Sequence, residues 1–329
     1  MTFGRSQSLA GLDHGRQAFG AALRARELTL AVLIVAVVIG MALASPHFLS
    51  LANFRAISIG LVPIAICAIG MTVLLASGGF DLSVGSVLAL SSTIVALLLI
   101  AGAPIPVAVA GALLLGVAVG LVNGLVVTKI GVNPLVATLG SMLIARGIAL
   151  VITEGFSLSS LPPAFGWAGR AEIAGVPFLL WVTLFLVVGF DLAMRHGSFF
   201  RKIYYIGANE KAARLSGLAV DRIKIVAYVL SGALAALAGV LLASRLMSGT
   251  PTAGNALELQ VLAAAVIGGA SLKGGEGTIL GAFLGVIFVA LLNNAMTMLA
   301  VSIYWQMIVT GAVLIAAVAF DMLVRRGEG

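Results

Sequence analysis

Six long stretches of this chain contain no Asp, Glu, Lys or Arg, and they limit the folds that it can adopt. They cover residues 28–54, 56–80, 82–128, 173–190, 225–244 and 277–320. A helix needs roughly 20 consecutive apolar residues to cross a bilayer, so each stretch is long enough for about one or two crossings. With 61% hydrophobic and 9% charged residues, the sequence predicts an all-α, polytopic helical membrane protein.

The charge-free stretches divide into about ten transmembrane helices. Gly102 and Pro104 supply a turn inside the stretch 82–128, and a hinge near 297–302 divides the stretch 277–320. The expected helices cover residues 28–44, 58–76, 84–101, 105–128, 134–153, 177–195, 222–246, 257–272, 276–298 and 300–321. We therefore expect a cytoplasmic tail over residues 1–26 and a single transmembrane domain over residues 27–329.

The distribution of Lys and Arg predicts the orientation. If the N-terminus lies inside, 15 of the 19 Lys and Arg residues fall in inside segments, and Arg55, Arg170 and Arg245 fall outside. Cytoplasmic loops of membrane proteins are enriched in these residues. Both termini are therefore expected in the cytoplasm, and the net charge of +7 requires no nucleic-acid partner.

The N-terminal region also allows a second interpretation. Arg24 and Arg26, the apolar residues after them and the sequence Ala42-Leu43-Ala44 resemble a signal peptide with its cleavage site. The polar segment of 26 residues that precedes the apolar stretch is long for a signal peptide. The charge count also favours a first helix that is retained.

A weak internal repeat occurs at an offset of 170 residues. Gly111 and Ala112 align with Gly281 and Ala282, and Asn123 aligns with Asn293. Chance matches among Gly- and Leu-rich segments are one explanation. Duplicated halves are the other, and transporters with such halves place their sites where the halves meet.

Glycine residues recur at helical spacing within one expected helix. Gly116, Gly120 and Gly124 fall four residues apart and therefore lie on one helix face. Small residues let transmembrane helices approach closely, since lipid gives no hydrophobic drive between them. This pattern predicts a helix-packing surface.

The chain contains no motif for using ATP itself. It lacks the sequence Gly-x-x-x-x-Gly-Lys-Ser/Thr that cradles phosphate,. It also lacks His-Glu-x-x-His, a cysteine cluster and Gly-x-Ser-x-Gly, which gives a membrane enzyme or scaffold little support. We expect this chain to bind no cofactor or metal.

A carrier driven by protons or sodium would normally bury several acidic residues. Only Asp81, Glu258 and Asp191 are placed for such a role. If the chain transports a solute, we expect another subunit to supply the energy for transport. An ion-gradient-driven carrier for a small polar solute remains the alternative.

Ten of the 31 charged residues lie between Asp191 and Lys224, in one expected cytoplasmic segment. Within it, Asn209 can cap a helix, and Gly217 can take the left-handed conformation that ends one. Glu210 and Arg214 suit the first and last turns. About eight residues do not form a stable helix alone in water, so we expect a partner or the rest of the chain to brace it. The alternative is an ordinary positively charged loop.

The stretch Tyr205–Gly217 resembles the cytoplasmic coupling segment of membrane subunits in bacterial ABC importers of the ribose/monosaccharide class. Three further blocks are similar to this family in the same order. They are Gly78–Ser86, then Asn123-Gly124 with Asn133–Gly140 and Arg146-Gly147, and finally Glu258–Gly277. The resemblance covers about residues 28–324. Gln260, Leu135 and Ala208 depart from the family pattern, which leaves the substrate identity and the loop geometry open.

The resemblance implies a permease subunit that moves a monosaccharide, a pentose or hexose, across the bacterial plasma membrane. It implies a homodimer or heterodimer of such subunits in lipid, a cytoplasmic ATPase that uses ATP and Mg, and a periplasmic or extracellular sugar-binding protein. The segment that couples to the ATPase spans about residues 205–219. Its expected coupling residues are Gly207, Asn209, Glu210, Ala213, Arg214, Leu215, Ser216 and Gly217.

Polar residues within or beside the expected spans are candidates for the substrate pathway or gate. Asp81 either caps the helix that begins near residue 84 or acts in the gate. Arg146 lies within a span and needs a cavity or a carboxylate, with Asp81 and Glu258 as candidate partners. For the amides and hydroxyls, hydrogen bonding between helices is the alternative. The full set is Asp81, Asn123, Asn133, Thr138, Arg146, Glu258 and Asn293.

Overall fold

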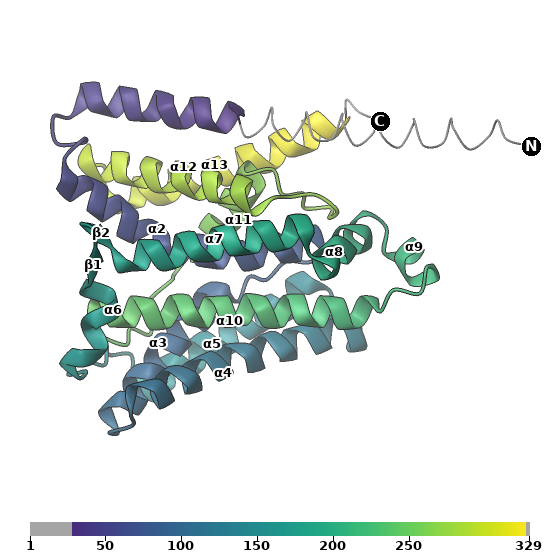
Figure 1. Cartoon of the computed structure of the whole chain (residues 1–329), viewed down its shortest axis with the longest axis horizontal. Helices are drawn as coiled ribbons and strands as arrows, with labels where there is room; N and C mark the ends of the chain where they lie inside the picture. Colours follow the sequence, from purple (N-terminus) through teal and green to yellow (C-terminus); the bar gives the residue numbers. More distant parts are fainter. Residues whose placement is uncertain (1–27, 327–329) are drawn as a thin grey trace, which may run out of the picture.

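The computed structural model describes residues 28–326 and shows a bundle of roughly parallel helices (Figure 1). The helix Leu28–Ala44 precedes the main elements. These are α2 (Leu51–Ala76), α3 (Val84–Ile100), α4 (Ile105–Leu125), α5 (Pro134–Thr153), α7 (Phe178–His196), α10 (Val220–Leu246), α11 (Leu257–Ile267), α12 (Ile279–Met298) and α13 (Ile303–Arg326). The smaller elements are a π-helical turn (Val126–Ile130), a 3-10 turn (Pro163–Gly166), α6 (Trp167–Arg170), the strands β1 (Glu172–Ile173) and β2 (Val176–Pro177), α8 (Ser198–Ala208) and α9 (Glu210–Leu215).

The prediction of an all-α membrane protein is confirmed. Within residues 28–326, six helices are long and apolar enough to cross a membrane, and four shorter apolar helices occupy the other expected positions. The predicted boundary of the helix 257–272 is wrong, because α11 ends at Ile267. Gly268 ends this helix, and Gly269 adopts the left-handed conformation with φ of +94°. The helix predicted from residue 58 starts earlier, at Leu51, where the Ser50 side chain caps it.

The glycine face of α4 is a helix-packing surface, as predicted, and the helix that packs on it is α10. A methyl group built at Gly116 would lie 2.4 Å from the carbonyl oxygen of Gly232, and one at Gly120 would lie 2.4 Å from that of Tyr228. No side chain fits at such distances. The two backbones are therefore in contact, which places α4 against the helix at the centre of the bundle.

Two short helices, α3 and α11, begin inside the bundle. Each follows a stretch without helical structure, residues 77–83 before α3 and 247–256 before α11. Ser231, the twelfth of the 27 residues of α10, donates a hydrogen bond to Asp81 just before α3. Gly85 at the start of α3 lies against the carbonyl of Gly254 before α11. Both helices therefore begin beside the middle of α10.

The order of elements repeats along the chain. Adding 170 to the first residues of α2, α3, α4 and α5 gives 221, 254, 275 and 304, while α10, α11, α12 and α13 begin at 220, 257, 279 and 303. The two series run in opposite directions, since α2 ends and α10 begins at the same end of the bundle (Figure 1). Such inverted duplication is common in transporters. The correspondence supports the predicted duplication.

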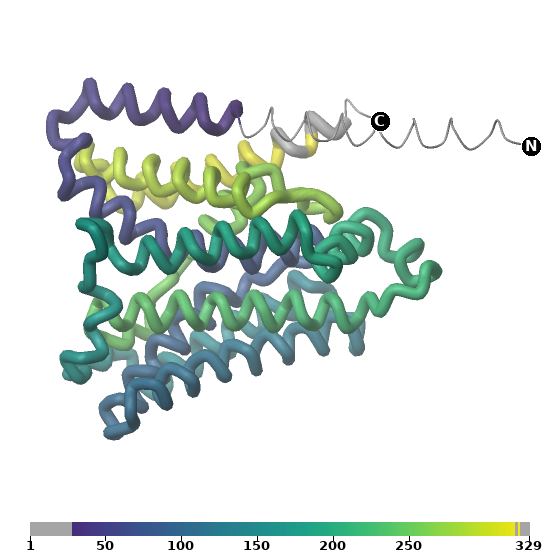
Figure 2. Tube along the Cα trace, viewed as in Figure 1, coloured from purple at the N-terminus to yellow at the C-terminus, as the bar shows by residue number. Residues whose placement is uncertain are grey.

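The two ends of the bundle differ in shape and charge. Helices α8 and α9 project at one end, where the helix Leu28–Ala44 begins and α13 ends, and β1 and β2 lie at the other (Figures 1 and 2). Arg55, Arg170 and Arg245 lie at the β1–β2 end. The α9 end holds Lys129, Arg195, Arg201, Lys202, Lys211, Arg214, Arg222, Lys224 and Lys273. This distribution supports the predicted cytoplasmic location of the α9 end.

Candidate functional site

Helix α9 has the local structure that the sequence predicted. The side chain of Asn209 accepts a hydrogen bond from the N–H of Ala212 (3.0 Å) at its start. At its end, Gly217 has φ of +79°. The N–H groups of Gly217 and Leu218 donate to the carbonyls of Arg214 (3.0 Å) and Ala213 (3.1 Å). This is a Schellman motif, so both predicted helix ends are confirmed.

A chain of ion pairs braces α9 against the rest of the protein. Glu210 pairs with Arg214 (2.9 Å) and with Lys224 of α10 (2.5 Å). Arg214 also pairs with Asp221 (2.7 Å), which in turn pairs with Lys129 after α4 (2.8 Å). Single exposed pairs contribute little, but a network fixes relative positions better than its separate pairs. The chain itself thus supplies the bracing that a six-residue helix needs.

The tip of α9 is free to meet a partner. Leu215 is 91% exposed, whereas Ala213 is buried against the rest of the chain. Helix α9 projects beyond the ends of the long helices, away from the apolar sides of the bundle (Figure 2). An apolar side chain in this position has no lipid to contact, so it suits a protein surface.

The ion pairs of Glu210 predict a measurable dependence on pH. Burial raises the pKa of Glu210, but hydrogen bonds from Lys224 and Arg214 lower it more, so the pKa lies below its ordinary value. The pairs therefore contribute stability above the ordinary pKa of Glu, about 4.3, and lose it as the pH falls through the lower folded-state pKa. Glu210→Gln should speed amide hydrogen exchange of residues 210–217 about two- to fivefold at pH 7. The difference should vanish once the pH has fallen below that folded-state pKa, where the wild-type carboxyl is protonated too,.

The control for this prediction is Glu172→Gln, which removes an ion pair with Arg55 (2.9 Å) at the other end of the bundle. It should leave exchange in residues 210–217 unchanged. Equal exchange in the wild type and Glu210→Gln at pH 7 would show that the ion pairs do not brace α9.

Helix α8 connects α9 to two other segments through direct backbone contact. A methyl group built at Gly207 would lie 2.0 Å from the carbonyl oxygen of Ala76 and 2.4 Å from the amide nitrogen of Gly275. The amide of Gly275 also donates a hydrogen bond to the carbonyl of Ala76 (3.0 Å). Gly274 also lies against Gly207 and Gly78. We call the contact of Gly78, Gly207, Gly274 and Gly275 the glycine junction.

The hydroxyl of Tyr204 adds a side-chain contact beside the glycine junction. It donates to the carbonyl of Gly277 (2.6 Å). Burial, and then the charge of Asp191, raise the pKa of Tyr204 to about 12, so this hydroxyl remains a donor at physiological pH. The end of α2, helix α8 and the loop after α11 are thereby held together. The sequence showed these glycines only as separate turns and motif residues.

Asp81 lies at the centre of a buried polar network that links four helices. One oxygen of its carboxyl group accepts from the N–H (2.9 Å) and the hydroxyl (2.5 Å) of Ser83, and the other accepts from Ser231 of α10 (3.1 Å). Asn123 of α4 donates to Ser83 (3.1 Å), and Ser141 of α5 donates to Asn123. Asp81 is not the N-cap of α3, because Ser83 holds that position without a side-chain cap. The Asp81 carboxyl group instead binds the turn just before the helix. Its role in a gate remains a prediction.

Arg146 hydrogen-bonds to backbone carbonyls. Its Nη1 donates to the carbonyls of Pro251 (2.6 Å) and Ala253 (2.7 Å) in the segment before α11. Glu258 is close enough to interact with it electrostatically, whereas Asp81 makes its bonds within the network above. The sequence predicted a cavity or a carboxylate for Arg146. Glu258 lies within electrostatic range, and backbone carbonyls, which the sequence did not predict, accept the hydrogen bonds.

The other predicted pathway residues are dispersed. Asn133 caps α5 by accepting from the N–H of Leu135 (2.8 Å), and the buried Thr138 bonds to Pro134 within the same helix (2.8 Å). Asn293 lies on α12, where its carbonyl accepts from Thr297 (2.9 Å). The structure groups Arg146 with Glu258 and Asp81 with Asn123, and it brings neither Asn133 nor Asn293 to these groups. Their pathway roles remain predictions.

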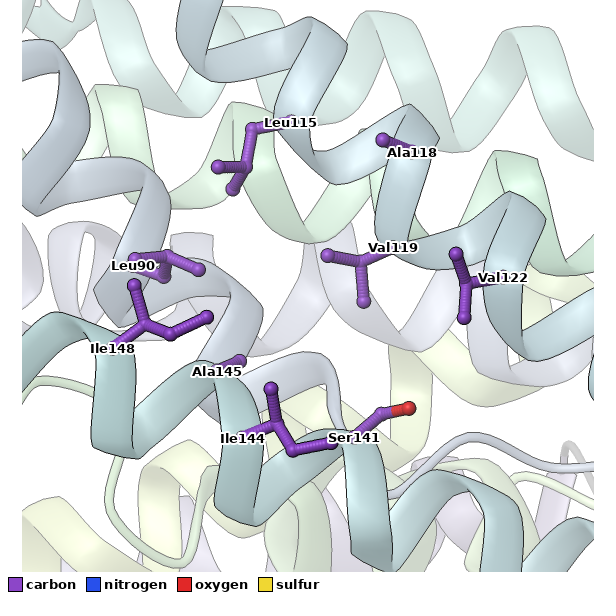
Figure 3. Close-up of a pocket in the computed structure, with 9 residues that line it drawn as sticks. All are labelled: Leu90, Leu115, Ala118, Val119, Val122, Ser141, Ile144, Ala145 and Ile148. Atoms are coloured by element: carbon purple, nitrogen blue, oxygen red, sulfur yellow. The ribbon is translucent and has the colours of Figure 1, made fainter.

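Two hollows on the described surface are lined by hydrocarbon. One, of about 320 Å³, lies between α3, α4 and α5, and the Ser141 hydroxyl is the polar group among its labelled lining residues (Figure 3). A larger one, of about 480 Å³, lies among the helix Leu28–Ala44, α2, α7 and α12. Such walls suit lipid chains better than sugars. Among residues 28–326, no group of three or more His, Cys, Asp or Glu side chains could hold a metal ion.

These features define an integral membrane protein with a capped and braced helix that projects beyond the ends of its long helices. Residues 53–318 match the family model described as branched-chain amino acid transport system / permease component, and the chain belongs to this family. No solved structure matches the chain.

Curated relatives cover nearly the whole chain. The ribose import permease protein RbsC of Escherichia coli K12 is 40% identical over 311 residues, or 93% of this chain and 97% of the relative. The protein of the same name from Bacillus subtilis is 38% identical, over 86% and 89%. The L-arabinose transport system permease protein AraH of Escherichia coli K12 is 37% identical, over 88% of each. The resemblance found in four motif blocks is thus confirmed.

Proposed function

We propose that this chain is the membrane-spanning subunit of an ATP-driven importer that brings a monosaccharide, a pentose or hexose, into the bacterial cytoplasm. The observation that carries the proposal is α9, a braced helix with an exposed Leu215 on a chain that has no nucleotide-binding motif. The names of the relatives, which are permeases for ribose and arabinose, support a sugar as the substrate.

The proposal includes three partners. An ATPase that binds ATP and Mg holds α9 on the cytoplasmic side, and this chain binds no cofactor of its own. A second permease subunit, identical or homologous, completes the transmembrane unit. A periplasmic or extracellular sugar-binding protein docks at the β1–β2 end and delivers the sugar.

The contacts of α9 suggest how ATP hydrolysis does work on the membrane domain. Closure of the ATPase moves α9, and the ion pairs to Lys224 and Asp221 carry the start of α10 with it. The glycine junction passes the same motion to the end of α2 and to the loop after α11. Since α3 and α11 begin inside the bundle, small shifts there change the middle of the membrane domain.

Gly217→Trp should uncouple ATP hydrolysis from sugar uptake. A side chain at φ of +79° strains the end of α9 by about 1–2 kcal/mol, and the bulky ring occupies the surface that meets the ATPase. We expect the reconstituted complex to lose uptake of labelled ribose or arabinose by about tenfold or more, which corresponds to about 1.4 kcal/mol of coupling. Stimulation of ATP hydrolysis by the binding protein should fall in parallel.

Gly131→Trp is the matched control, because Gly131 also has positive φ (+82°) and open space around it at the α9 end of the bundle but lies between the π-helical turn and α5. Uptake and stimulated hydrolysis should survive this change. Intact coupling in Gly217→Trp would remove α9 from the mechanism. Uphill sugar accumulation by vesicles that contain this chain alone and an ion gradient would establish the secondary carrier in its place.

A further inference from the structure

Polar side chains surround the point where α3 and α11 begin. Thr252 and Asn255 are exposed, and Arg146, Glu258 and Gln260 are half-buried. Arg146 is fixed to this region by its bonds to the carbonyls of Pro251 and Ala253. We call these five polar residues, Arg146, Thr252, Asn255, Glu258 and Gln260, the central polar surface.

The central polar surface lies near mid-depth of the bundle. The carbonyl of Gly254 and the carboxyl of Glu258 both lie against Gly85. Gly85 stands between Asp81, which is bonded to Ser231 of α10, and Leu88, whose carbonyl lies against Gly239 of α10. Helix α10 has 27 residues and is therefore about 40 Å long, and residues 231–239 include its middle. The central polar surface is thus roughly 10 Å or more from either end of α10,.

Lipid cannot cover a surface of this kind at this depth. The segment 247–256 is not helical, and non-helical backbone within a bilayer occurs only when it is buried in protein or lines a water-filled cavity. Arg146 and Glu258 are half-exposed, and a charged group in contact with hydrocarbon costs several kcal/mol or more. They too must therefore face protein or water. Two independent properties therefore require water or protein here.

The surroundings of the central polar surface are apolar. Leu143 and Ile144, within one turn of Arg146 on α5, are 68% and 64% exposed. The central polar surface itself offers donors and acceptors together, namely a guanidinium, two amides, a hydroxyl and a carboxyl group. This combination suits a neutral solute with many hydroxyls, which can give and accept hydrogen bonds at each of them.

We infer that the central polar surface is one wall of a water-filled passage and contacts the sugar as it crosses the middle of the membrane. The inference rests on the proposed function, in which a second permease subunit supplies the opposite wall. Thr252 and Asn255 are the new residues in this assignment. They touch the sugar directly, while Arg146 also holds the segment 247–256 in place.

Accessibility of an introduced thiol tests the passage. The described residues contain one cysteine, the buried Cys67, and Cys67→Ala gives a background without reactive thiols. In this background Asn255→Cys is treated with methanethiosulfonate ethylsulfonate, which is water-soluble and does not cross membranes. A thiol reacts through its thiolate, which forms in water and not in lipid. We expect the Asn255→Cys variant to react at least about tenfold faster than a lipid-facing control.

Leu114→Cys is the matched control. Leu114 is 66% exposed and lies two residues before Gly116, which contacts Gly232 near the middle of α10. It therefore has the same depth and apolar surroundings. Both variants are measured in the assembled complex, with uptake of labelled ribose and arabinose before and after the reagent.

Modification of Asn255→Cys should reduce uptake by about tenfold, because the attached sulfonate fills the passage, whereas Leu114→Cys should keep its uptake after the same treatment. Thr252→Cys, an independent exposed position, should behave like Asn255→Cys. Slow reaction at both polar positions, or fast reaction without loss of uptake, would overturn the inference while the proposed function stands. Failure of the untreated complex to take up either sugar would count against the proposed function, and the thiol reactivity would still decide whether this surface meets water.

Discussion

Gly207→Val should abolish sugar uptake by the assembled transporter. Even the first carbon of a side chain would lie 2.0 Å from the carbonyl of Ala76 and 2.4 Å from the amide of Gly275, between two backbone groups that are bonded to each other. Neither group can rotate away as a flexible side chain would. Overpacking at such a site costs about 3 kcal/mol or more. The glycine junction must therefore open, which separates α8 from the end of α2 and from the loop after α11.

The measurement combines the amount of folded protein in the membrane with uptake per molecule. We expect a loss of uptake by about a hundredfold or more, which corresponds to about 2.7 kcal/mol. Gly189→Ala is the control, since Gly189 lies within α7 and has open space where a side chain would grow. Alanine there should leave uptake unchanged, because alanine favours a helix over glycine. Normal uptake in Gly207→Val would show that the glycine junction does not transmit motion.

Asp81→Ala should destabilise the membrane domain strongly. The change leaves Ser83 and Ser231 without their buried acceptor, and each unpaired buried group costs about 1–3 kcal/mol. The effect should extend to α4 and α5, because Asn123 and Ser141 continue the same network. We expect a loss of about 2–4 kcal/mol in the free energy of unfolding. A thermal shift of the purified complex, together with its yield from membranes, measures this loss.

Asp81→Asn is the variant to compare with Asp81→Ala. Its amide oxygen can accept from Ser83, and its NH₂ group can donate to Ser231, so the network can form again. We expect near-normal thermal stability and uptake within a few-fold of the wild type. A folded Asp81→Asn protein that cannot transport would instead assign the carboxyl group to the gate, the alternative that the sequence left open.

The sequence predicted the long helices and the short helix α9 well, because both depend on local properties. Insertion into a bilayer depends on the apolar character of about 20 neighbouring residues, so charge-free stretches locate the helices. The ends of α9 follow from Asn209 and Gly217, whose preferences act over a single turn. The glycines of α4 predicted a packing face for the same reason, although the sequence did not identify α10 as the partner.

The sequence was less informative about α11 and Arg146. Residues 257–272 are apolar enough to read as one helix, although the pair Gly268-Gly269 within them is a turn signal, and the helix ends there. Arg146 was expected to face a cavity or an acidic partner, since a charge within a span needs one of them. Backbone carbonyls supply that partner, and no sequence pattern marks a carbonyl that is free to accept.

Local chemistry along the chain thus determined how many helices form, which end carries the positive charge and where a short helix can be capped. Only the tertiary structure decided which distant groups meet. Asp81 binds Ser231, 150 residues away, and Arg146 binds Pro251, 105 residues away. The glycine junction joins Gly207 to Gly78, 129 residues away, and to Gly274, 67 residues away. These contacts depend on how rigid helices pack against one another. Packing depends on the surfaces of all the helices together, so no single stretch of residues determines it.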